Sequence, residues 1–352
     1  MESPPVTIII ATWNSVRHLD GCLGSIMRQV YRNFRVLAVD GASSDGTAEY
    51  IRQRFPEVKV LKCQENLGYR RANALGMARA TGSYVVVTND DVEVDENWLG
   101  SLVQYMEANS RTGLATPLIL YHSDPGLVNG AGNILHFTGM YCSRGKNRPR
   151  EEYALSGPVP AVSGCCFIVR REVLERVGGF SGDFDAYDTG WHSGFEDVDL
   201  CWRARMSGYE IGYVAESVLY HKYTQRPMVL ARYVSYEFGR YLVAIRNFER
   251  RTLLLLLPLL VVIEAGSLLY SLYRGPRWLM AKGRLWIWML RHVVVLRGMR
   301  SRVQSARTLG DKRVLAAMSP ELCISVIGQW QERAANAAFR AYRALLSRLV
   351  AA

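Results

Sequence analysis

Four short apolar segments near the start of the chain alternate with stretches typical of helices, and this alternation limits the fold more than any other feature. The apolar segments are Val6–Ile10, Arg35–Val39, Val58–Leu61 and Tyr84–Thr88. Nearly continuous apolar runs are typical of strands buried on both faces, and strands that alternate with helices form parallel sheets. We therefore predict an α/β fold with a mostly parallel central sheet flanked by helices.

The fourth predicted strand ends in the acidic tip Asn89-Asp90-Asp91. Adjacent carboxylates repel and are costly to desolvate, so they favour a cation as partner, and hard oxygen ligands suit Mg²⁺ or Mn²⁺. Taken alone, such a pair is more often an acidic turn that caps a strand. Asp40 ends the second strand in the same way, and ligands of parallel sheets bind beyond the carboxyl ends of the strands.

Two loops after predicted strands carry further polar residues. The turn Asp40–Thr47 contains glycines that permit close backbone approach, and Asp40 could accept a hydrogen bond from a nucleobase or ribose. The plainer interpretation is a capped turn. Arg70 and Arg71 follow the third strand, where they could neutralise a diphosphate or form a solvated surface pair.

Acidic residues and a histidine mark two later elements. Glu196, Asp197 and Asp199 begin a predicted helix. Acids complement the dipole of a helix start, but one of these carboxylates could instead be a general base. His221 ends the predicted strand 214–220 and is either structural or a ligand that completes a metal site.

The tail of the chain is basic and apolar. The 352 residues carry a net charge of +11, and most of the excess lies between Arg274 and Arg313. Thr252–Tyr273 is about long enough to span a bilayer, but Glu264 lies near its middle and basic residues flank both of its ends. We favour a re-entrant or interfacial segment, with one or two true spans or a buried core helix as the alternatives. Trp278–Leu296 suits an interfacial helix.

The last predicted helix is Pro320–Leu349, and one of its faces is apolar. That face consists of Ile327, Trp330, Ala334, Ala338, Tyr342, Leu345 and Leu349. It could pack on the membrane, on the domain or on a second copy in a homo-oligomer. We therefore predict three regions: a catalytic domain at 1–230, a membrane-associating basic region at 231–313 and an amphipathic helix at 314–352.

The N-terminus and the cysteines indicate a compartment. Met1–Pro5 has neither the charged nor the apolar region of a signal peptide, and the seven cysteines form no Cys-x-x-Cys pair. We expect the catalytic part to lie in a reducing compartment on the cytoplasmic side. Nucleic acid is the weaker candidate partner, because the basic residues flank leucine-rich segments instead of interleaving with polar surface.

In this order and spacing, the segments resemble the family 2 glycosyltransferases of the GT-A fold. The resemblance covers about 6–223. It is carried by Thr12-Trp13-Asn14, Asp40 to Thr47, Glu65 to Tyr69 with Asn73, Thr88 to Asp91, Ser163-Gly164, Arg170-Arg171, Gly178-Gly179-Phe180, Glu196-Asp197 and His221. The tail also resembles that of bacterial membrane-associated members that elongate lipid-linked glycans, including rhamnosyltransferases.

The resemblance implies an inverting, metal-dependent transfer from a UDP-, dTDP- or GDP-sugar to a hydroxyl of a polyprenyl-linked or other glycan, at the cytoplasmic face of the membrane. It implies that Asp197 is the base and that Asp91 and His221 bind Mg²⁺ or Mn²⁺. The substrate-binding residues would be Thr12, Asn14, Asp40, Asn66, Gly68, Asn73, Asn89, Asp90, Gly164, Trp191 and Glu196.

Two departures from the family pattern stand out: the segment Asp185–Gly194 is longer than usual, and Arg70-Arg71 is more basic. An inactive scaffold that partners another membrane enzyme of glycan assembly is the alternative function.

Overall fold

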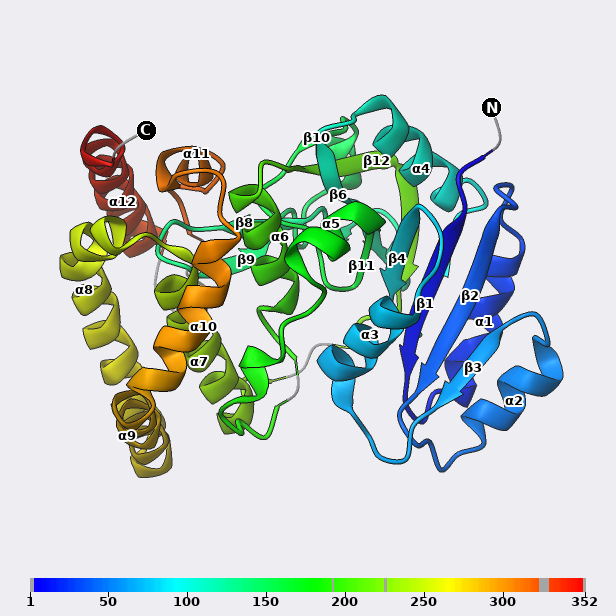
Figure 1. Ribbon diagram of the computed structural model, residues 1–352, viewed down its shortest axis with the longest axis horizontal. Coiled ribbons are helices and arrows are strands. Elements are labelled where there is room, and N and C mark those ends of the chain that lie inside the picture. The colour runs from blue at the N-terminus through cyan, green and yellow to red at the C-terminus, as the bar shows by residue number, and fades with distance from the viewer. Residues whose placement is uncertain (1–2, 192, 225–226, 323–328, 351–352) are drawn as a thin grey trace.

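The computed structural model describes residues 3–191, 193–224, 227–322 and 329–350 (Figure 1). A twisted sheet with helices on both faces forms one half of the molecule, and a group of helices from the C-terminal third forms the other half. The strands are β1 (Val6–Thr12), β2 (Phe34–Asp40), β3 (Lys59–Lys62), β4 (Tyr84–Thr88), β5 (Val92–Val94), β6 (Thr112–Tyr121), β7 (Val128–Gly130), β8 (Asn133–Leu135), β9 (Tyr141–Ser143), β10 (Gly157–Pro158), β11 (Cys166–Arg170) and β12 (Glu210–His221).

Ten of these strands form one sheet in the order β10-β12-β6-β11-β4-β1-β2-β3, with β5 paired to β12 and β7 paired to β6. The strands from β4 to β3 run parallel, as the sequence predicts, whereas β11 lies antiparallel between β4 and β6. The predicted α/β fold with a mostly parallel central sheet is confirmed.

The helices of the first half cover both faces of the sheet. They are α1 (Val16–Met27), α2 (Thr47–Arg54), α3 (Gly68–Arg79), α4 (Trp98–Ala108), α5 (Arg171–Val177) and α6 (Glu196–Met206). Side chains of α1, α2 and α4 share one apolar core with the sheet, and those of α3, α5 and α6 share the other. Because β1 and β4 are covered on both sides, apolar residues occupy nearly every position in them.

The strand register brings the polar strand ends together. Thr12 of β1 lies opposite Asp40 of β2, and β4 ends beside them. Cys166, at the start of the antiparallel β11, lies opposite Thr88, the last residue of β4. His221, at the end of β12, pairs with Val92, the residue after the acidic tip. Residues far apart in sequence therefore meet at one edge of the sheet.

The C-terminal helices are α7 (Leu230–Asn247), α8 (Arg250–Arg274), α9 (Pro276–Arg291), α10 (Val293–Ser305), α11 (Asp311–Ala316) and α12 (Gln329–Leu349). An ion pair joins them to the first half. Asp199 of α6 is fully buried and pairs with Arg246 of α7 and, at 2.8 Å, with Arg203. Burial alone would raise the pKa of Asp199, but the two guanidiniums lower it to about 2. Asp199, predicted as one of three candidate catalytic acids, is therefore a structural anion.

Among the described helices, α8 is long and apolar enough to cross a membrane, by length and composition alone. Its one acid, Glu264, is already paired: its carboxylate lies 2.8 Å from Arg240 of α7 and 2.8 Å from Lys282 of α9. Lys282 interrupts the apolar stretch Trp278–Leu296 in the sequence, but its side chain is buried and pairs with Glu237 and Glu264. The segment Trp278–Leu296 is two helices, α9 and α10, which meet at His292.

The last helix differs from its prediction at its start. Pro320 to Leu322 are not helical, and within the described residues α12 begins at Gln329. Phe339, Leu346 and Val350 are buried against the rest of the chain, and Tyr342 of the predicted face is half-buried and packs there too. Trp330, Leu345 and Leu349 of the predicted apolar face are exposed, and Ile327 lies outside the described residues. The proposed region boundaries after 230 and 313 remain predictions.

Candidate active site

The acidic tip and the histidine form a close pair. Nε2 of His221 lies 3.2 Å from Oδ1 of Asp91. The strand register explains the contact, because β12 ends opposite β5 and the backbone N–H of Lys222 donates to the carbonyl of Asp91 at 2.9 Å. The two residues predicted as metal ligands are therefore brought together.

The second nitrogen of His221 indicates what the pair can bind. Nδ1 lies 2.9 Å from Oδ1 of Asn129, an acceptor, so Nδ1 carries the proton in the neutral ring. Nε2 then turns a lone pair toward Asp91, whose buried Oδ1 has no hydrogen-bond donor among the described residues. Two lone pairs at this distance repel unless a proton or a cation lies between them. A divalent cation fits this position.

The two ligands leave most of a metal's coordination shell open. Among the residues that the structure describes, no group of three or more His, Cys, Asp or Glu side chains is arranged to hold a metal ion. Mg²⁺ is commonly held by one or two protein groups, with substrate phosphates and water as its other ligands. Asp91 and His221 therefore fit a metal that binds together with a diphosphate, and not a closed structural site.

Asp197 is a buried carboxyl at the first turn of α6. Its Oδ1 accepts from the backbone N–H of Val198 at 2.9 Å, and its Oδ2 accepts from Nδ2 of Asn133 at 2.9 Å. Burial, together with the neighbouring charge of Glu196, raises the pKa of Asp197 from 3.8 to about 7. A carboxyl that titrates near neutrality suits a general base, because it is both ionised and basic at working pH.

Glu196 is held in place by a loop and by an arginine. Its carboxylate accepts from the backbone N–H of Gly194 at 2.6 Å and from Ser193 Oγ at 3.1 Å. Nε of Arg70 lies 3.7 Å away, and another nitrogen of Arg70 pairs with Asp185 at 2.6 Å. Both sequence interpretations of Arg70 were wrong: it is a buried structural cation, neither a solvated surface residue nor free to bind a diphosphate. Arg71 is exposed beside Glu65.

The other two residues of the acidic tip have distinct surroundings. Asp90 accepts a hydrogen bond from the hydroxyl of Ser15, and burial raises its pKa despite that bond. Asp90 therefore fastens the tip of β4 to the loop after β1. The backbone N–H of Asn89 donates to the carbonyl of Cys165 at 3.0 Å. This bond connects the tip to the loop that carries Gly164.

The residues predicted to bind a nucleoside lie where β1 and β2 end, and the loops that follow these two strands bind each other. Oδ1 of Asn14 accepts from the backbone N–H of Ser44 at 2.8 Å, and Asn14 has a left-handed backbone with φ of 52°. Asp40 is fully buried, and Ser43 caps its carboxylate. Thr12 is buried beside it at the end of β1. The structure brings these three residues together, and their contact with a nucleoside remains a prediction.

Four further predicted residues lie in different surroundings, and Gly164 is the one that contacts Asp197. A Cβ built on Gly164 would lie 3.2 Å from Asp197 Oδ2, so only glycine fits against the base without displacing it. Asn66 caps the start of α3 by accepting from the N–H of Gly68 at 2.8 Å. Asn73 is buried on the same helix. Trp191 is half-buried in the loop before α6, and its role as an acceptor contact stays a prediction; its neighbour His192 lies outside the described residues.

Sequence reasoning missed three residues that support this site. Ser15 binds Asp90, Asn129 binds His221 and Asn133 binds Asp197. Asn129 and Asn133 lie in the glycine-rich stretch after β6, in a part of the chain that the sequence predicts to cover the nucleotide half and to shape an acceptor site, without a role for either asparagine. The asparagines within that stretch were the available signal.

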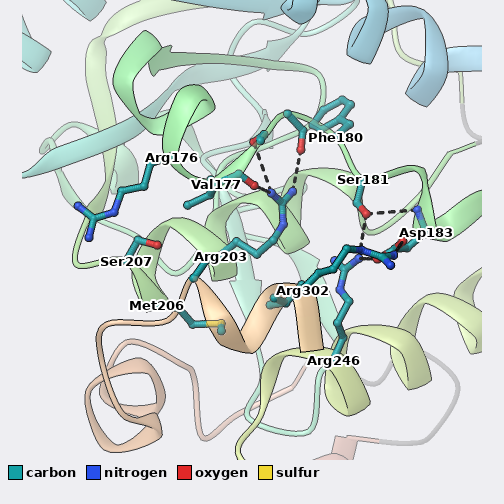
Figure 2. Close-up of a pocket in the computed structure, with 14 residues that line it drawn as sticks. Arg176, Val177, Phe180, Ser181, Asp183, Arg203, Met206, Ser207, Arg246 and Arg302 are labelled. Atoms are coloured by element: carbon teal, nitrogen blue, oxygen red, sulfur yellow. Dashed lines mark hydrogen bonds and ion pairs between the residues drawn. The ribbon is translucent and has the colours of Figure 1, made fainter. Parts of the chain in front are cut away.

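A cavity of about 340 Å³ lies between α5, α6 and α10, and it marks a junction and not this site (Figure 2). Its lining, as far as the structure describes the chain, includes none of the predicted site residues. Arg203 projects into it and donates to the carbonyl of Val177 and, at 2.8 Å, to the carbonyl of Gly179. These hydrogen bonds satisfy carbonyls at the C-terminal end of α5. Arg246 donates to Ser181 at 2.9 Å and pairs with Asp183 at 2.6 Å. These bonds join the catalytic half to the C-terminal helices.

A close Asp–His pair and a buried carboxyl near the polar edge of such a sheet match the expected glycosyltransferase site with the GT-A fold, and comparisons with known proteins support the family. The family model described as glycosyl transferase family 2 matches residues 7–178. The N-acetylglucosaminyl-diphospho-decaprenol L-rhamnosyltransferase of Mycobacterium tuberculosis is 30% identical over 246 residues, which make up 61% of this chain and 75% of that protein. The chain belongs to the family 2 glycosyltransferases.

Two other similarities have a narrower meaning. An uncharacterised protein of Sinorhizobium fredii is 29% identical over 243 residues, which are 63% of this chain but 25% of that longer protein. The solved mannosyltransferase of Pyrobaculum calidifontis, in complex with GDP-Man and Mn²⁺, aligns with a TM-score of 0.51 and 20% identity over 99% of this chain and 84% of its own. At that identity the likeness establishes the fold alone.

Proposed function

We propose that this glycosyltransferase transfers a sugar from a nucleoside diphosphate donor to a hydroxyl of a lipid-linked glycan. We infer that the transfer inverts the configuration at the anomeric carbon and needs a divalent metal. One observation carries the proposal: the loop Gly164-Cys165 touches the base on one side and the metal-binding tip on the other. Gly164 packs against Asp197, while Cys165 binds Asn89. The buried base and the diphosphate position are thus adjacent.

The proposed reaction is a single displacement. Ionised Asp197 takes the proton of the acceptor hydroxyl as the hydroxyl oxygen attacks the anomeric carbon of the donor sugar. The bond from that carbon to the diphosphate oxygen breaks on the opposite face, so the configuration inverts. Asp91 and His221 would hold Mg²⁺ or Mn²⁺, which as a Lewis acid stabilises charge on the leaving diphosphate. Asn133 and Gly164 keep the carboxylate of Asp197 in place.

The donor and acceptor classes rest on chemistry and on similarity. A metal held by Asp91 and His221 alone has most of its coordination shell open, and the phosphate oxygens of a nucleoside diphosphate can supply further ligands. UDP-, dTDP- and GDP-sugars are the candidates. The name of the M. tuberculosis relative states N-acetylglucosaminyl-diphospho-decaprenol and a rhamnosyl transfer. We extend the acceptor class, a polyprenyl-linked glycan, to this chain by that similarity.

The C-terminal helices support work at a membrane surface. Between 250 and 305 the only acid is Glu264, which is paired internally. Arginines of this stretch are exposed, and apolar side chains are exposed with them, among them Leu254, Val262, Leu269, Leu290 and Val294. Apolar residues next to exposed cations favour binding to anionic lipid headgroups. The cytoplasmic face is the side where we expect this binding.

A transfer assay on the full chain tests the function. The protein is incubated with labelled UDP-, dTDP- and GDP-sugars, Mn²⁺ or Mg²⁺, and a polyprenyl diphosphate-linked acceptor. Wild type should form product with at least one donor, and EDTA, Asp91→Ala or Asp197→Asn should each abolish it. Asp20→Asn, which changes an exposed acid that pairs with Arg54 and is not one of the predicted site residues, is the matched control and should stay active. Neither transfer nor donor hydrolysis with any donor would instead favour the inactive scaffold.

A further inference from the structure

We propose that one short segment, Asn129 to Asn133, positions both halves of the site: Asn133 orients the base Asp197, and Asn129 orients the metal ligand His221. Only three residues separate the two asparagines, yet each reaches a different functional side chain. This inference rests on the proposed function of that site and adds the positioning residues to it.

Asn133 is a buried residue at the start of β8, and hydrogen bonds fix both its side-chain amide and its backbone. Its Nδ2 donates to the carbonyl of Val162 at 2.8 Å and to Oδ2 of Asp197 at 2.9 Å. Its backbone N–H donates to Ala161 at 2.8 Å. The amide therefore has one orientation, and the hydrogen bond that it gives Asp197 is stronger when that carboxyl is ionised.

Asn129 occupies an irregular position in β7. The pairing of β7 with β6 shifts register between Ile119 and Leu120, which lie opposite Gly130 and Val128, so Asn129 is the extra residue of a bulge. Bulges redirect a side chain, and here the amide oxygen reaches Nδ1 of His221. That bond fixes the tautomer in which Nε2 can bind a metal.

Two glycines keep the segment in this path. Gly132 has a left-handed φ of +87°, and a Cβ on it would come within 2.9 Å of the carbonyl of Ala161. A Cβ on Gly130 would come within 3.1 Å of Ser143 Oγ. The backbone is thus closely packed on both sides between the two asparagines. The two asparagines bind different functional side chains, so each can be tested separately.

Other groups also act on Asp197 and must be kept constant. Glu196 raises its pKa from the same helix, and Cys201 lies on that helix too. Charged and titratable groups on the packed elements are Arg70 and Tyr69 of α3 and Tyr141 of β9. None of these changes when Asn133 is replaced, so a change in the pH profile reports on the Asn133 bond.

The test for Asn133 is the pH dependence of kcat/KM with the donor that wild type uses in the transfer assay. Asn133→Ala removes the hydrogen bond that stabilises ionised Asp197, so the pKa of Asp197 should rise. The acidic limb of the kcat/KM profile should therefore move up by about one pH unit. Asn133→Asp adds a negative charge beside the base and should move it further. Asn133→Ser is a smaller change that keeps a donor near Val162, in case alanine prevents folding. A structural role alone would lower kcat at every pH, and limbs that coincide with wild type in all three variants would overturn the proposal.

The test for Asn129 measures metal binding without catalysis. Mn²⁺ is titrated by electron paramagnetic resonance in the presence of the nucleoside diphosphate (UDP, dTDP or GDP) that wild type binds. Asn129→Leu, which has the same shape but cannot accept from Nδ1, should weaken Mn²⁺ binding about tenfold, and Asn129→Asp, which can accept, should retain it. Equal affinity in Asn129→Leu and wild type would refute this half. If wild type itself binds no Mn²⁺, the proposed metal site fails, and the Asn133 result still decides its own half.

Discussion

Replacing Asp197 by asparagine is expected to abolish transfer and, at the same time, to change the stability of the fold in a direction that depends on pH. Burial and the charge of Glu196 raise the pKa of Asp197 from 3.8 to about 7. A carboxyl whose pKa is higher in the folded state stabilises the fold most at low pH. That contribution is lost as the pH rises from about 4 through 7, because the folded protein must then ionise a buried acid.

The magnitude follows from the same values. The pKa rises from 3.8 to about 7, and one pH unit corresponds to about 1.36 kcal/mol, so ionised Asp197 costs the folded state at most about 4 kcal/mol at pH 8. Asparagine removes that cost. It also loses one of two hydrogen bonds, from Val198 or Asn133, because its amide has only one acceptor oxygen, and this loss costs about 1–2 kcal/mol. Asp197→Asn should therefore be about 2 kcal/mol more stable at pH 8, about as stable as wild type near pH 5, and about 1 kcal/mol less stable at pH 4, where the unfolded carboxyl is only half ionised.

The assay is thermal unfolding of both proteins between pH 4 and pH 9. The difference in Tm should change sign between these limits, with about 2 °C for each kcal/mol. Asp20→Asn, at an exposed position, should follow wild type at every pH. A difference between Asp197→Asn and wild type that stays constant across the range would show that Asp197 ionises at its ordinary pKa, and the assignment of a neutral-range base would be wrong.

Three further outcomes follow from the structure. In wild type, kcat/KM should rise with pH through about 7 as Asp197 ionises, and an acidic limb near pH 4 would contradict the base assignment. Asp199→Ala leaves Arg203 and Arg246 without their buried partner and should lower the free energy of unfolding by about 3–5 kcal/mol in urea titrations; a loss under 1 kcal/mol would show that the pair does not hold the two halves together. Full-length protein should float with anionic vesicles, Arg277→Glu/Arg284→Glu should float less, and Arg52→Glu, on the far helix α2, should not change flotation, whereas equal flotation of all three would refute docking by the basic helices.

The sheet and its polar edge could be predicted from the sequence because they depend on local patterns. Apolar runs that alternate with helical stretches define β1 to β4, and parallel strands place Asp40 and Asp91 at the same edge. The contact between Asp91 and His221 needs a pairing of β12 with β5, and a resemblance to known proteins, not spacing, predicted it.

The roles of Arg70 and Asp199 were missed for a physical reason. Each pairs with residues distant in sequence, Arg70 with Asp185 and Asp199 with Arg246, so their charges are satisfied only after folding. A sequence shows that a charge is present but not what lies next to it. The same holds for Lys282, whose partner Glu264 lies on the neighbouring helix and explains why this lysine of α9 is buried.

The helix at the end of the chain shows the limit of periodicity. An apolar stripe indicates that one face can be buried but not what buries it. Two neighbouring stripes compete on α12, and the structure packs the one with Phe339 and Leu346 against the chain while Trp330 stays exposed. Tertiary contact decides which side chains are buried, and Tyr342 of the predicted face also packs inward and donates from its hydroxyl to the carbonyl of Leu255 in α8.

The central claim is that Asp91 and His221 bind a divalent metal together with the diphosphate of the donor. Electron paramagnetic resonance of Mn²⁺ measures this directly, since free hydrated Mn²⁺ gives a strong signal that bound Mn²⁺ loses. With wild type and UDP, dTDP or GDP, the free signal should fall for at least one nucleotide, and much less without nucleotide. Asp91→Asn and His221→Gln should leave the signal near that of nucleotide alone, whereas full binding in both variants would contradict the account.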